Sequence, residues 1–260
     1  MSTLSEKVAN KYDETSQGLK NKFAAELYAG TDFLNWGYWR EDTQNVGEAC
    51  ENLMGELLKL IPEKMGKILD VACGKGATTR YLLGYFKPEN VTGINISHEQ
   101  LKICRRKLPN CTFLYMDATR LDFEDATFDN IICVEAAHHF DTREDFLRES
   151  RRVLVDGGCL VMSDIRTDRR NKHSPPENYT ETLDDYRDVY RKVGFRNVDI
   201  VDVSEEVRGG LADHYMKFAK AKFQKNEMGP IQFKRFMTVY NQFRPTFKTA
   251  QNYLLVRCFK

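Results

Sequence analysis

The sequence predicts an α/β fold, and three observations lead to this prediction. Strand and helix signals alternate from residue 67 to about residue 203, as they do in the βαβ units of a parallel sheet. The run ILDV, apolar except for its aspartate, is followed by the glycine turn ACGKG, a pattern typical of a buried parallel strand that ends at a ligand. With 260 residues, 42% of them hydrophobic, the chain can bury one sizeable core.

The expected strands are short apolar runs bounded by turn residues. They lie at residues 67–72, 90–94, 111–115, 128–134, 159–164, 197–203 and 252–259. Helices are expected between them where a capping residue or a glycine marks an end. Residues 99–107 follow the cap Ser97, residues 143–153 stop before Asp156, and residues 183–193 end at Gly194.

Two further segments lie outside this alternation. Residues 1–62 are predicted to form an N-terminal helical lid, in which helical patterns at 4–28 and 48–60 flank the aromatic segment FLNWGYW. Residues 63–204 form the core, with a polar loop at 165–182, and residues 251–260 form its final strand. Residues 205–250 carry aromatic side chains at near-helical spacing. That stripe fits plain core packing or a helical cap over a substrate site, and we predict the cap.

Composition argues against several classes of function. The formal net charge is +1, and no basic face with interleaved aromatic residues indicates nucleic acid. The N-terminus lacks a secretion-signal pattern, and no apolar run approaches the roughly 18 to 20 residues that span a bilayer, so we expect a cytoplasmic protein with no membrane span. Seven cysteines without a C-x-x-C pair are expected to be buried free thiols. The oligomeric state is left open.

The glycine turn is the main functional signal. Gly74 and Gly76 let the backbone approach a ligand, and the helix expected after them directs its N-terminal amides to the same place. The dinucleotide spacing G-x-G-x-x-G fails because Thr79 stands at its third position, and no phosphate-loop spacing follows Gly76. The turn therefore predicts a nucleoside site of another kind.

The run D-V-A-C-G-K-G at residues 70–76 resembles the first motif, D-x-G-x-G-x-G, of the class I S-adenosylmethionine (SAM) dependent methyltransferases. Ala72 stands where the motif has its first glycine, which costs about 1 kcal/mol or more if that residue needs positive φ. The resemblance implies a Rossmann-like core with a seven-stranded, mostly parallel sheet whose last strand is antiparallel. It also implies SAM as cofactor, S-adenosylhomocysteine as product, and cofactor contacts from Asp70, Ala72, Gly74 and Gly76.

The segment VTGINISHEQL at residues 91–101 narrows the resemblance. It is similar to the V-x-G-[IL]-[TS]-[IL]-S-x-x-Q segment of small-molecule methyltransferases, which natural-product sugar O-methyltransferases, tocopherol methyltransferases and cyclopropane fatty acid synthases share. This implies that Asn95, Ile96 and Gln100 bind the cofactor, with the Asn95 amide in place of the acid that usually meets the ribose hydroxyls. Ser97 either joins them or only caps the following helix.

The same resemblance implies further cofactor contacts. Asp117 and Ala118 match the family's pair at the adenine, where a carboxylate can accept a hydrogen bond from the exocyclic amine. Glu135, after the fourth strand, is expected to bind the cofactor as well. The N-W-G-Y-W run matches an element that closes over SAM and substrate, so Tyr12 and Trp36 are expected to pack on the cationic sulfonium.

A histidine pair is the candidate for proton transfer. His138 and His139 follow the fourth strand, and Asp164 is expected to end the fifth strand on the same rim. A histidine could deprotonate a hydroxyl as the oxygen attacks the methyl group. In the sugar O-methyltransferases an H-H pair and an acid assist this step, which implicates these three residues, with one histidine in the pocket and the other behind it. The same set could hold a divalent metal, but its spacing is not characteristic and we predict none.

The sequence thus predicts a SAM-dependent methyltransferase that acts on a hydroxyl of a small-molecule acceptor, such as a partly apolar natural product. Transfer to carbon or nitrogen and a catalytically silent SAM-binding protein are the alternatives. RNA methylation is disfavoured by the near-neutral charge and by the absence of an N-P-P-Y type motif.

Overall fold

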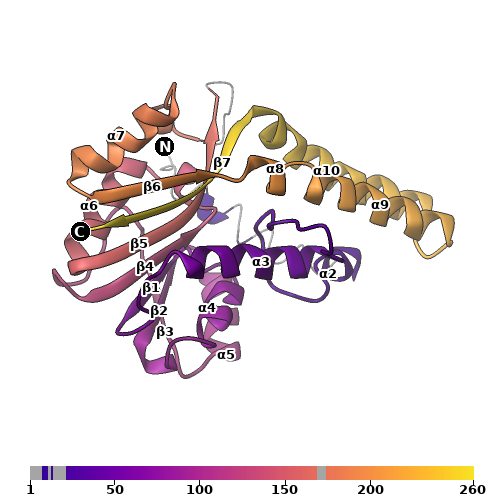
Figure 1. The fold of residues 1–260 in the computed structure, drawn as a ribbon. Coiled ribbons are helices and arrows are strands. Elements are labelled where there is room, and N and C mark those ends of the chain that lie inside the picture. The colour runs from indigo at the N-terminus through magenta and orange to yellow at the C-terminus, as the bar shows by residue number, and fades with distance from the viewer. Residues whose placement is uncertain (1–7, 11–12, 14–21, 169–173) are drawn as a thin grey trace.

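A computed structural model describes residues 8–10, 13, 22–168 and 174–260. Its centre is a seven-stranded sheet in the order β3-β2-β1-β4-β5-β7-β6, with helices on both sides (Figure 1). The strands are β1 (Ile68–Val71), β2 (Val91–Asn95), β3 (Thr112–Tyr115), β4 (Phe128–Val134), β5 (Leu154–Thr167), β6 (Arg196–Asp202) and β7 (Ala250–Phe259).

Strands β1 to β5 pair in parallel, and β7 runs antiparallel to both β5 and β6. The order of the strands reverses at β1, which has β2 on one side and β4 on the other. At such a switch point the loops after neighbouring strands diverge and leave a crevice for a ligand. The predicted α/β fold and its antiparallel last strand are confirmed, and six of the seven strands lie within two residues of their predicted bounds.

The exception is β5, which the sequence predicts to be much shorter. It begins at Leu154, directly after the preceding helix, and runs to Thr167, so residues 165–167 belong to the sheet and not to the predicted loop. The strand is longer than predicted because residues 165–167 pair with β7 residues between Ala250 and Tyr253. Asp164 therefore lies inside a strand, and its expected place at a strand end is wrong.

The helices are α2 (Lys22–Leu27), α3 (Val46–Lys59), α4 (Ala77–Leu82), α5 (His98–Lys107), α6 (Arg143–Val153), α7 (Leu183–Val193), α8 (Ser204–Val207), α9 (Gly210–Gln224) and α10 (Pro230–Thr249). Short 3-10 turns cover Pro88–Asn90, Ala137–His139 and Pro176–Asn178. The predicted end signals are confirmed. Ser97 caps α5 by accepting a hydrogen bond from the Gln100 amide at 3.2 Å, and Gly194 ends α7 with a φ of +100°.

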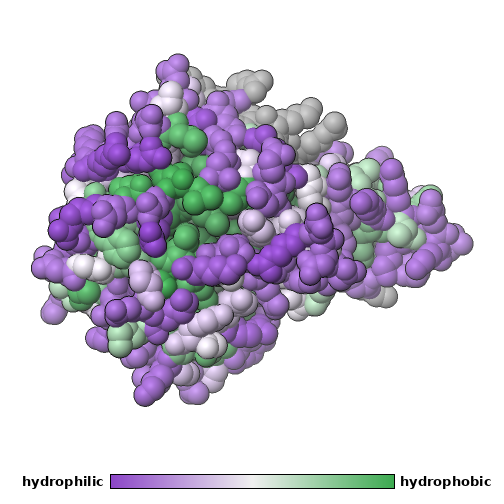
Figure 2. Space-filling model, viewed as in Figure 1, coloured by the Kyte–Doolittle hydropathy of each residue, from purple (hydrophilic) through white to green (hydrophobic). Residues whose placement is uncertain are grey.

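The sheet is covered on both faces because successive strand residues point to opposite sides. Ile68 of β1 packs in one apolar cluster with Leu53 of α3, and Leu69 packs in a second cluster with Phe146 of α6 and Tyr186 of α7. Burial on both faces explains why the central strands β1, β2 and β4 are rich in apolar residues, whereas β6 at the sheet edge is largely exposed. On the face shown in Figure 2, apolar side chains remain visible between α3 and β6.

Helices α9 and α10 form a hairpin whose far end extends away from the sheet (Figure 1). Its root packs on the core, where Tyr215 stacks on Phe236 with ring centroids 4.3 Å apart and Phe236 contacts Phe23 of α2. Trp39 of the aromatic segment lies against His214 at this root. That the root shapes a substrate cavity stays a prediction. Among the described residues, no helix combines the length and the apolar character needed to cross a membrane.

Candidate active site

The glycine turn connects β1 to α4 at the switch point of the sheet. Ala72, Gly74 and Gly76 have φ values of +57°, +55° and +84°, so the turn needs left-handed backbone at all three positions. Glycine adopts this conformation freely, whereas Ala72 is strained because its Cβ crowds the next carbonyl. A Cβ built on Gly74 would meet only Leu34, at 3.8 Å, which leaves the space in front of the turn open.

Asp70 lies at the base of this turn and is almost fully buried. Its Oδ2 accepts hydrogen bonds from the hydroxyls of Thr78 and Thr79 at 2.7 and 2.6 Å. Burial raises the pKa of Asp70 to about 6, although these two bonds lower it. Its Oδ1 is buried with no hydrogen-bond partner among the described residues. A buried acceptor of this kind can take a hydrogen bond from a bound molecule.

The end of β2 is tied to the turn by an amide. Asn95 donates from Nδ2 to the Gly74 carbonyl at 3.3 Å and to Gln100 Oε1 at 2.8 Å, and its Oδ1 accepts from the Ser97 amide. Asn95 and Gln100 are buried and hold each other, while Ile96 between them is half-buried. The structure thus brings the predicted residues together at the turn, with Asn95 positioning its backbone.

Asp13, near the N-terminus, was not predicted to take part in this site. Its Oδ1 accepts hydrogen bonds from the Ser97 hydroxyl and, at 3.3 Å, from the Glu99 amide. This carboxylate therefore caps the positive end of α5 and anchors an N-terminal residue beside β2. The one sequence signal was the helical pattern around Asp13, which says nothing of what the helix contacts.

The end of β3 carries the predicted acid. Asp117 is half-buried, and its Oδ1 accepts hydrogen bonds from the backbone amide and the hydroxyl of Thr119, at 2.9 and 2.8 Å. Ala118 beside it is buried in the same apolar cluster as Leu121 and Ile94. Thr119 thus fixes the orientation of a carboxylate at the same edge of the sheet as the turn.

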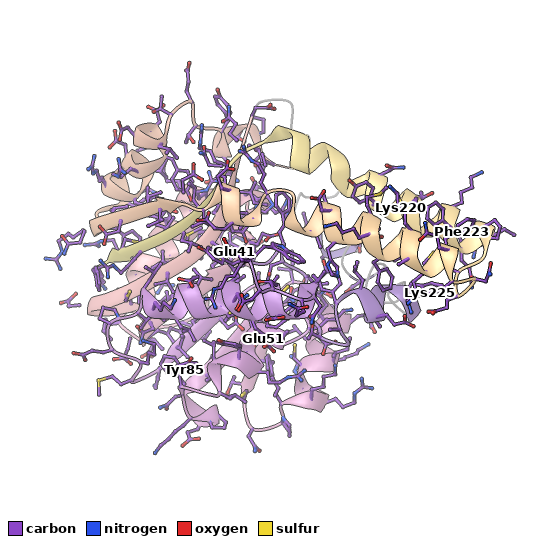
Figure 3. The ribbon with its side chains drawn as sticks, turned by 45° about the vertical axis from the view of Figure 1, so that its right-hand side comes forward. Glu41, Glu51, Tyr85, Lys220, Phe223 and Lys225 are labelled. Atoms are coloured by element: carbon purple, nitrogen blue, oxygen red, sulfur yellow. The ribbon has the colours of Figure 1, made fainter. Side chains whose placement is uncertain are left out.

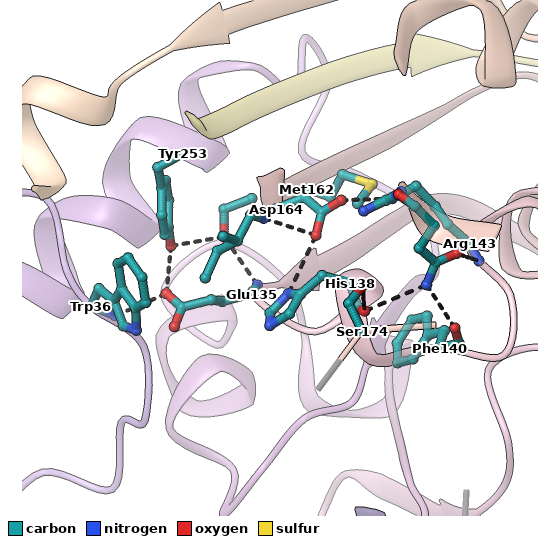
Figure 4. A network of polar contacts seen from close by, with 12 residues as sticks. Trp36, Glu135, His138, Phe140, Arg143, Met162, Asp164, Ser174 and Tyr253 are labelled. Atoms are coloured by element: carbon teal, nitrogen blue, oxygen red, sulfur yellow. Dashed lines mark hydrogen bonds and ion pairs between the residues drawn. The ribbon is translucent and has the colours of Figure 1, made fainter. Parts of the chain in front are cut away.

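Glu135 lies directly after β4 and joins three distant parts of the chain (Figure 4). Its Oε2 accepts hydrogen bonds from the Trp36 amide at 2.9 Å and from the Tyr253 hydroxyl at 2.7 Å. Its own amide donates to the Ser163 carbonyl at 2.9 Å. Burial raises the pKa of Glu135 to about 8, against the lowering effect of the bonds from Tyr253 and Trp36. The carboxyl group is therefore mostly protonated at neutral pH.

His138 faces a buried acid. Its Nδ1 lies 3.4 Å from Asp164 Oδ1, and the two side chains are 4% and 0% exposed. Asp164 Oδ2 accepts from Arg143 Nε at 2.8 Å and from the Tyr186 hydroxyl at 2.9 Å. Burial raises the pKa of Asp164, but Arg143 and His138 outweigh this effect and hold it at about 2. Asp164 is thus ionised and lies behind His138, away from the rim where the sequence placed it.

His139 is the more accessible histidine of the pair. It is half-buried, and its ring centroid lies 3.9 Å from that of His138 at an interplanar angle of 44°. Tyr12, a predicted cofactor contact, lies outside the described residues, whereas Trp36 is buried beside Tyr253 with ring centroids 5.9 Å apart. Within the described part of the chain, no group of three or more His, Cys, Asp or Glu side chains is arranged to hold a metal ion.

Sequence reasoning missed the residues that lie behind His138 and beside Glu135. Arg143 begins a helix whose other charged side chains are exposed or half-buried, and Tyr186 and Tyr253 come from α7 and β7. Only the pairing of β5 with β7 and the packing of α7 on the sheet bring these side chains together. No local spacing in the sequence records that contact.

These features define a class of protein. A nucleoside bearing an amino acid chain needs close backbone approach, an acceptor for its amino group and an acceptor for its base. The open turn at Gly74, the unpartnered Asp70 Oδ1 and the oriented Asp117 carboxylate offer groups of these kinds at one edge of the sheet. With β7 antiparallel between β5 and β6, the fold is that of a class I SAM-dependent methyltransferase.

Comparison with known proteins leads to the same class. Residues 69–162 match the family model described as a methyltransferase domain. The chain is 30% identical over 251 residues to the O-methyltransferase cnsE of Penicillium expansum, covering 84% of this chain and 87% of that protein. The chain therefore belongs to the SAM-dependent methyltransferases, with SAM as cofactor.

Solved structures show the same fold at low sequence identity. The match to the [4+2]-cyclase SpnF has a TM-score of 0.73 at 21% identity, and it covers 98% of this chain and 96% of the cyclase chain. The geranyl diphosphate C-methyltransferase of Streptomyces coelicolor, solved with S-adenosylhomocysteine, has a TM-score of 0.69 at 13% identity and covers 99% of this chain and 98% of its own.

Proposed function

We propose that this methyltransferase transfers the methyl group of SAM to a hydroxyl group of a small natural-product acceptor, with His139 as the general base. The observation that carries the proposal is the histidine pair after β4, in which one ring is buried against an ionised acid and the other is half-buried. The similarity to a protein named as an O-methyltransferase supports transfer to oxygen.

The cofactor would be held by the turn at Gly74 and Gly76, by Asp70 and by Asp117. When bound, SAM supplies a methyl group that is electrophilic because it is attached to a sulfonium. Asn95 and Gln100 keep the turn in place through their bonds to Gly74 and to each other. This preorganisation is the larger catalytic term, since holding two reacting groups in line supplies roughly 7 to 11 kcal/mol of the barrier.

The proton would move from the acceptor hydroxyl to His139 as the new carbon–oxygen bond forms. His138 cannot take this role as easily, because its ring is almost fully buried and its Nδ1 faces Asp164. His138 instead packs against the His139 ring and fixes its place. General base catalysis of this kind contributes about 10²- to 10⁴-fold.

An acceptor screen with methyl-labelled SAM tests the proposal. Panels of hydroxyl, amine and activated-carbon compounds are offered to the wild-type protein, His139→Gln and His139→Ala. We expect transfer to hydroxyls, a loss of about 10²- to 10⁴-fold in both variants, and partial rescue of His139→Ala by added imidazole. S-adenosylhomocysteine binding should be unchanged in both, which separates a lost base from a lost fold.

Other outcomes would identify the rival functions. Transfer to amines that survives His139→Ala would indicate an N-methyltransferase, because a neutral amine needs little base. Transfer to carbon alone would place the protein with the C-methyltransferases. Binding of S-adenosylhomocysteine without transfer to any acceptor would indicate a catalytically silent protein.

A further inference from the structure

The far end of the α9–α10 hairpin carries an unusual set of exposed side chains. Phe223 is 42% exposed and Ile231 is 73% exposed, the latter the most exposed large apolar side chain of the described residues. Four exposed cations surround them. We call this set the hairpin end: Lys220, Phe223, Lys225, Ile231, Lys234 and Arg235. Figure 3 shows Lys220, Phe223 and Lys225 on the part of the hairpin that projects beyond the sheet.

Helix geometry groups the apolar and cationic side chains. Ile231, Lys234 and Arg235 are spaced i, i+3 and i+4 and so share one face of α10, while Lys220 and Phe223 share a face of α9. The two helices are joined at this end, where Phe223 packs on Phe233 with ring centroids 5.1 Å apart. Each of the two helices therefore carries an exposed apolar side chain with a cation on the same face of that helix.

The charge of this surface is not neutralised locally. Among the described residues, none of the four cations of the hairpin end forms an ion pair with an acidic side chain. The nearby acid Glu227 is instead bonded to Lys222, which also pairs with Glu26 of α2. The whole chain has a formal net charge of only +1, so the concentration of positive charge here is a local property that the folded hairpin creates.

We propose that the hairpin end binds the surface of an anionic phospholipid bilayer. Phe223 and Ile231 would enter the boundary between headgroups and acyl chains, and the four cations would lie among the phosphates. Basic side chains interleaved with exposed apolar ones are the pattern of interfacial membrane binding. Such binding needs no membrane-spanning helix and would hold the enzyme where apolar acceptors accumulate.

Two other partners fit the surface less well. A second copy of the chain would place four cations against four cations in a symmetric contact, which opposes association. The phosphates of a nucleic acid would be attracted to the four cations. An aliphatic side chain such as Ile231, however, cannot stack on a base as an aromatic ring does. The lipid surface is the partner that satisfies both the charge and the aliphatic side chain.

Vesicle flotation with the full-length protein tests the proposal. Vesicles of phosphatidylcholine alone are compared with vesicles in which about one third is phosphatidylglycerol, at an ionic strength of about 0.1 M. We expect selective binding to the anionic vesicles, weakened by salt. The double variant Lys220→Gln and Lys234→Gln should bind them more weakly by about five-fold for each lysine removed.

Matched variants elsewhere on the surface are the controls. Lys87→Gln with Arg106→Gln removes two exposed cations far from the hairpin, and Met65→Ser removes an exposed apolar side chain. These should bind anionic vesicles as the wild type does, whereas Phe223→Ser with Ile231→Ser should bind them less.

Several results would overturn the proposal. The first is that the wild-type protein binds neither kind of vesicle, or binds both kinds equally. This result does not depend on any variant folding correctly. Another is an equal loss in the control variants. Binding of RNA or duplex DNA without vesicle binding, or self-association lost on Ile231→Ser, would assign the surface to the other partners.

Discussion

Ala72 offers a direct test of how the cofactor turn is built. Its φ of +57° costs an alanine about 1 to 2 kcal/mol, whereas a glycine at the same place only loses the roughly 0.4 to 1 kcal/mol that comes from a more flexible unfolded chain. Ala72→Gly, which restores the family's motif, should therefore raise the free energy of unfolding by about 0.5 to 1 kcal/mol. For a chain of this size that is a rise of about 1 to 4 °C in Tm.

Urea and thermal unfolding followed by circular dichroism measure the effect. Ala126→Gly is the matched control, because Ala126 has a φ of +53° in an exposed turn before β4, at the opposite edge of the sheet. It should show a similar gain. Gly76→Ala should lose stability, since its φ is +84° and the added Cβ would lie 3.2 Å from Cys104 Sγ. Unchanged or lower stability in Ala72→Gly would refute the idea that the turn is strained at this residue.

Two further predictions concern buried charge. Arg143→Leu leaves Asp164 ionised and buried without its guanidinium partner, so we expect the free energy of unfolding in urea to fall by about 3 to 5 kcal/mol. The control Arg148→Leu breaks an exposed pair with Glu144 and should lower it by less than about 1 kcal/mol. Equal losses in the two variants would contradict the assignment of a buried pair. For Glu135, the pKa of about 8 lies above its ordinary 4.5, so the folded protein holds a proton that the unfolded chain releases. Wild-type stability should therefore fall as pH rises from about 4.5 to about 8, by at most about 1.4 kcal/mol per pH unit from this group. Glu135→Gln should flatten that decline, and a pH profile unchanged by the substitution would show that Glu135 titrates normally.

The sequence was sufficient for the fold because the central strands carry apolar runs, with glycines and capping residues between them. It was insufficient where pairing, and not pattern, decides the structure. Residues 165–167 are mostly polar and follow a predicted strand end, yet they remain in β5 because β7 lies beside them. The projection of the α9–α10 hairpin was missed for a related reason. An aromatic stripe predicts that a helix face is buried, but not which partner buries it.

The site shows the same division. Residues at or just after strand ends, such as Asp70, Asp117 and Glu135, could be placed at one edge because parallel strands present their carboxyl ends together. The bonds between side chains could not be predicted. Asp164 reads as a rim acid from its position in the sequence, and only the packing of Arg143 and Tyr186 against it shows that it lies behind His138. Contacts between residues far apart in the chain leave no local trace.

The central claim is that the carboxyl ends of β1 to β3 hold the cofactor, with Asp117 binding its adenine. Calorimetric titration with S-adenosylhomocysteine tests it most directly, using the wild type, Asp117→Ala and the control Asp122→Ala, an exposed acid in the same loop. We predict micromolar binding by the wild type and the control, and an affinity about 10- to 100-fold lower in Asp117→Ala, as expected for one lost hydrogen bond to a charged group. Absence of binding by the wild type, or full affinity in Asp117→Ala, would contradict the account.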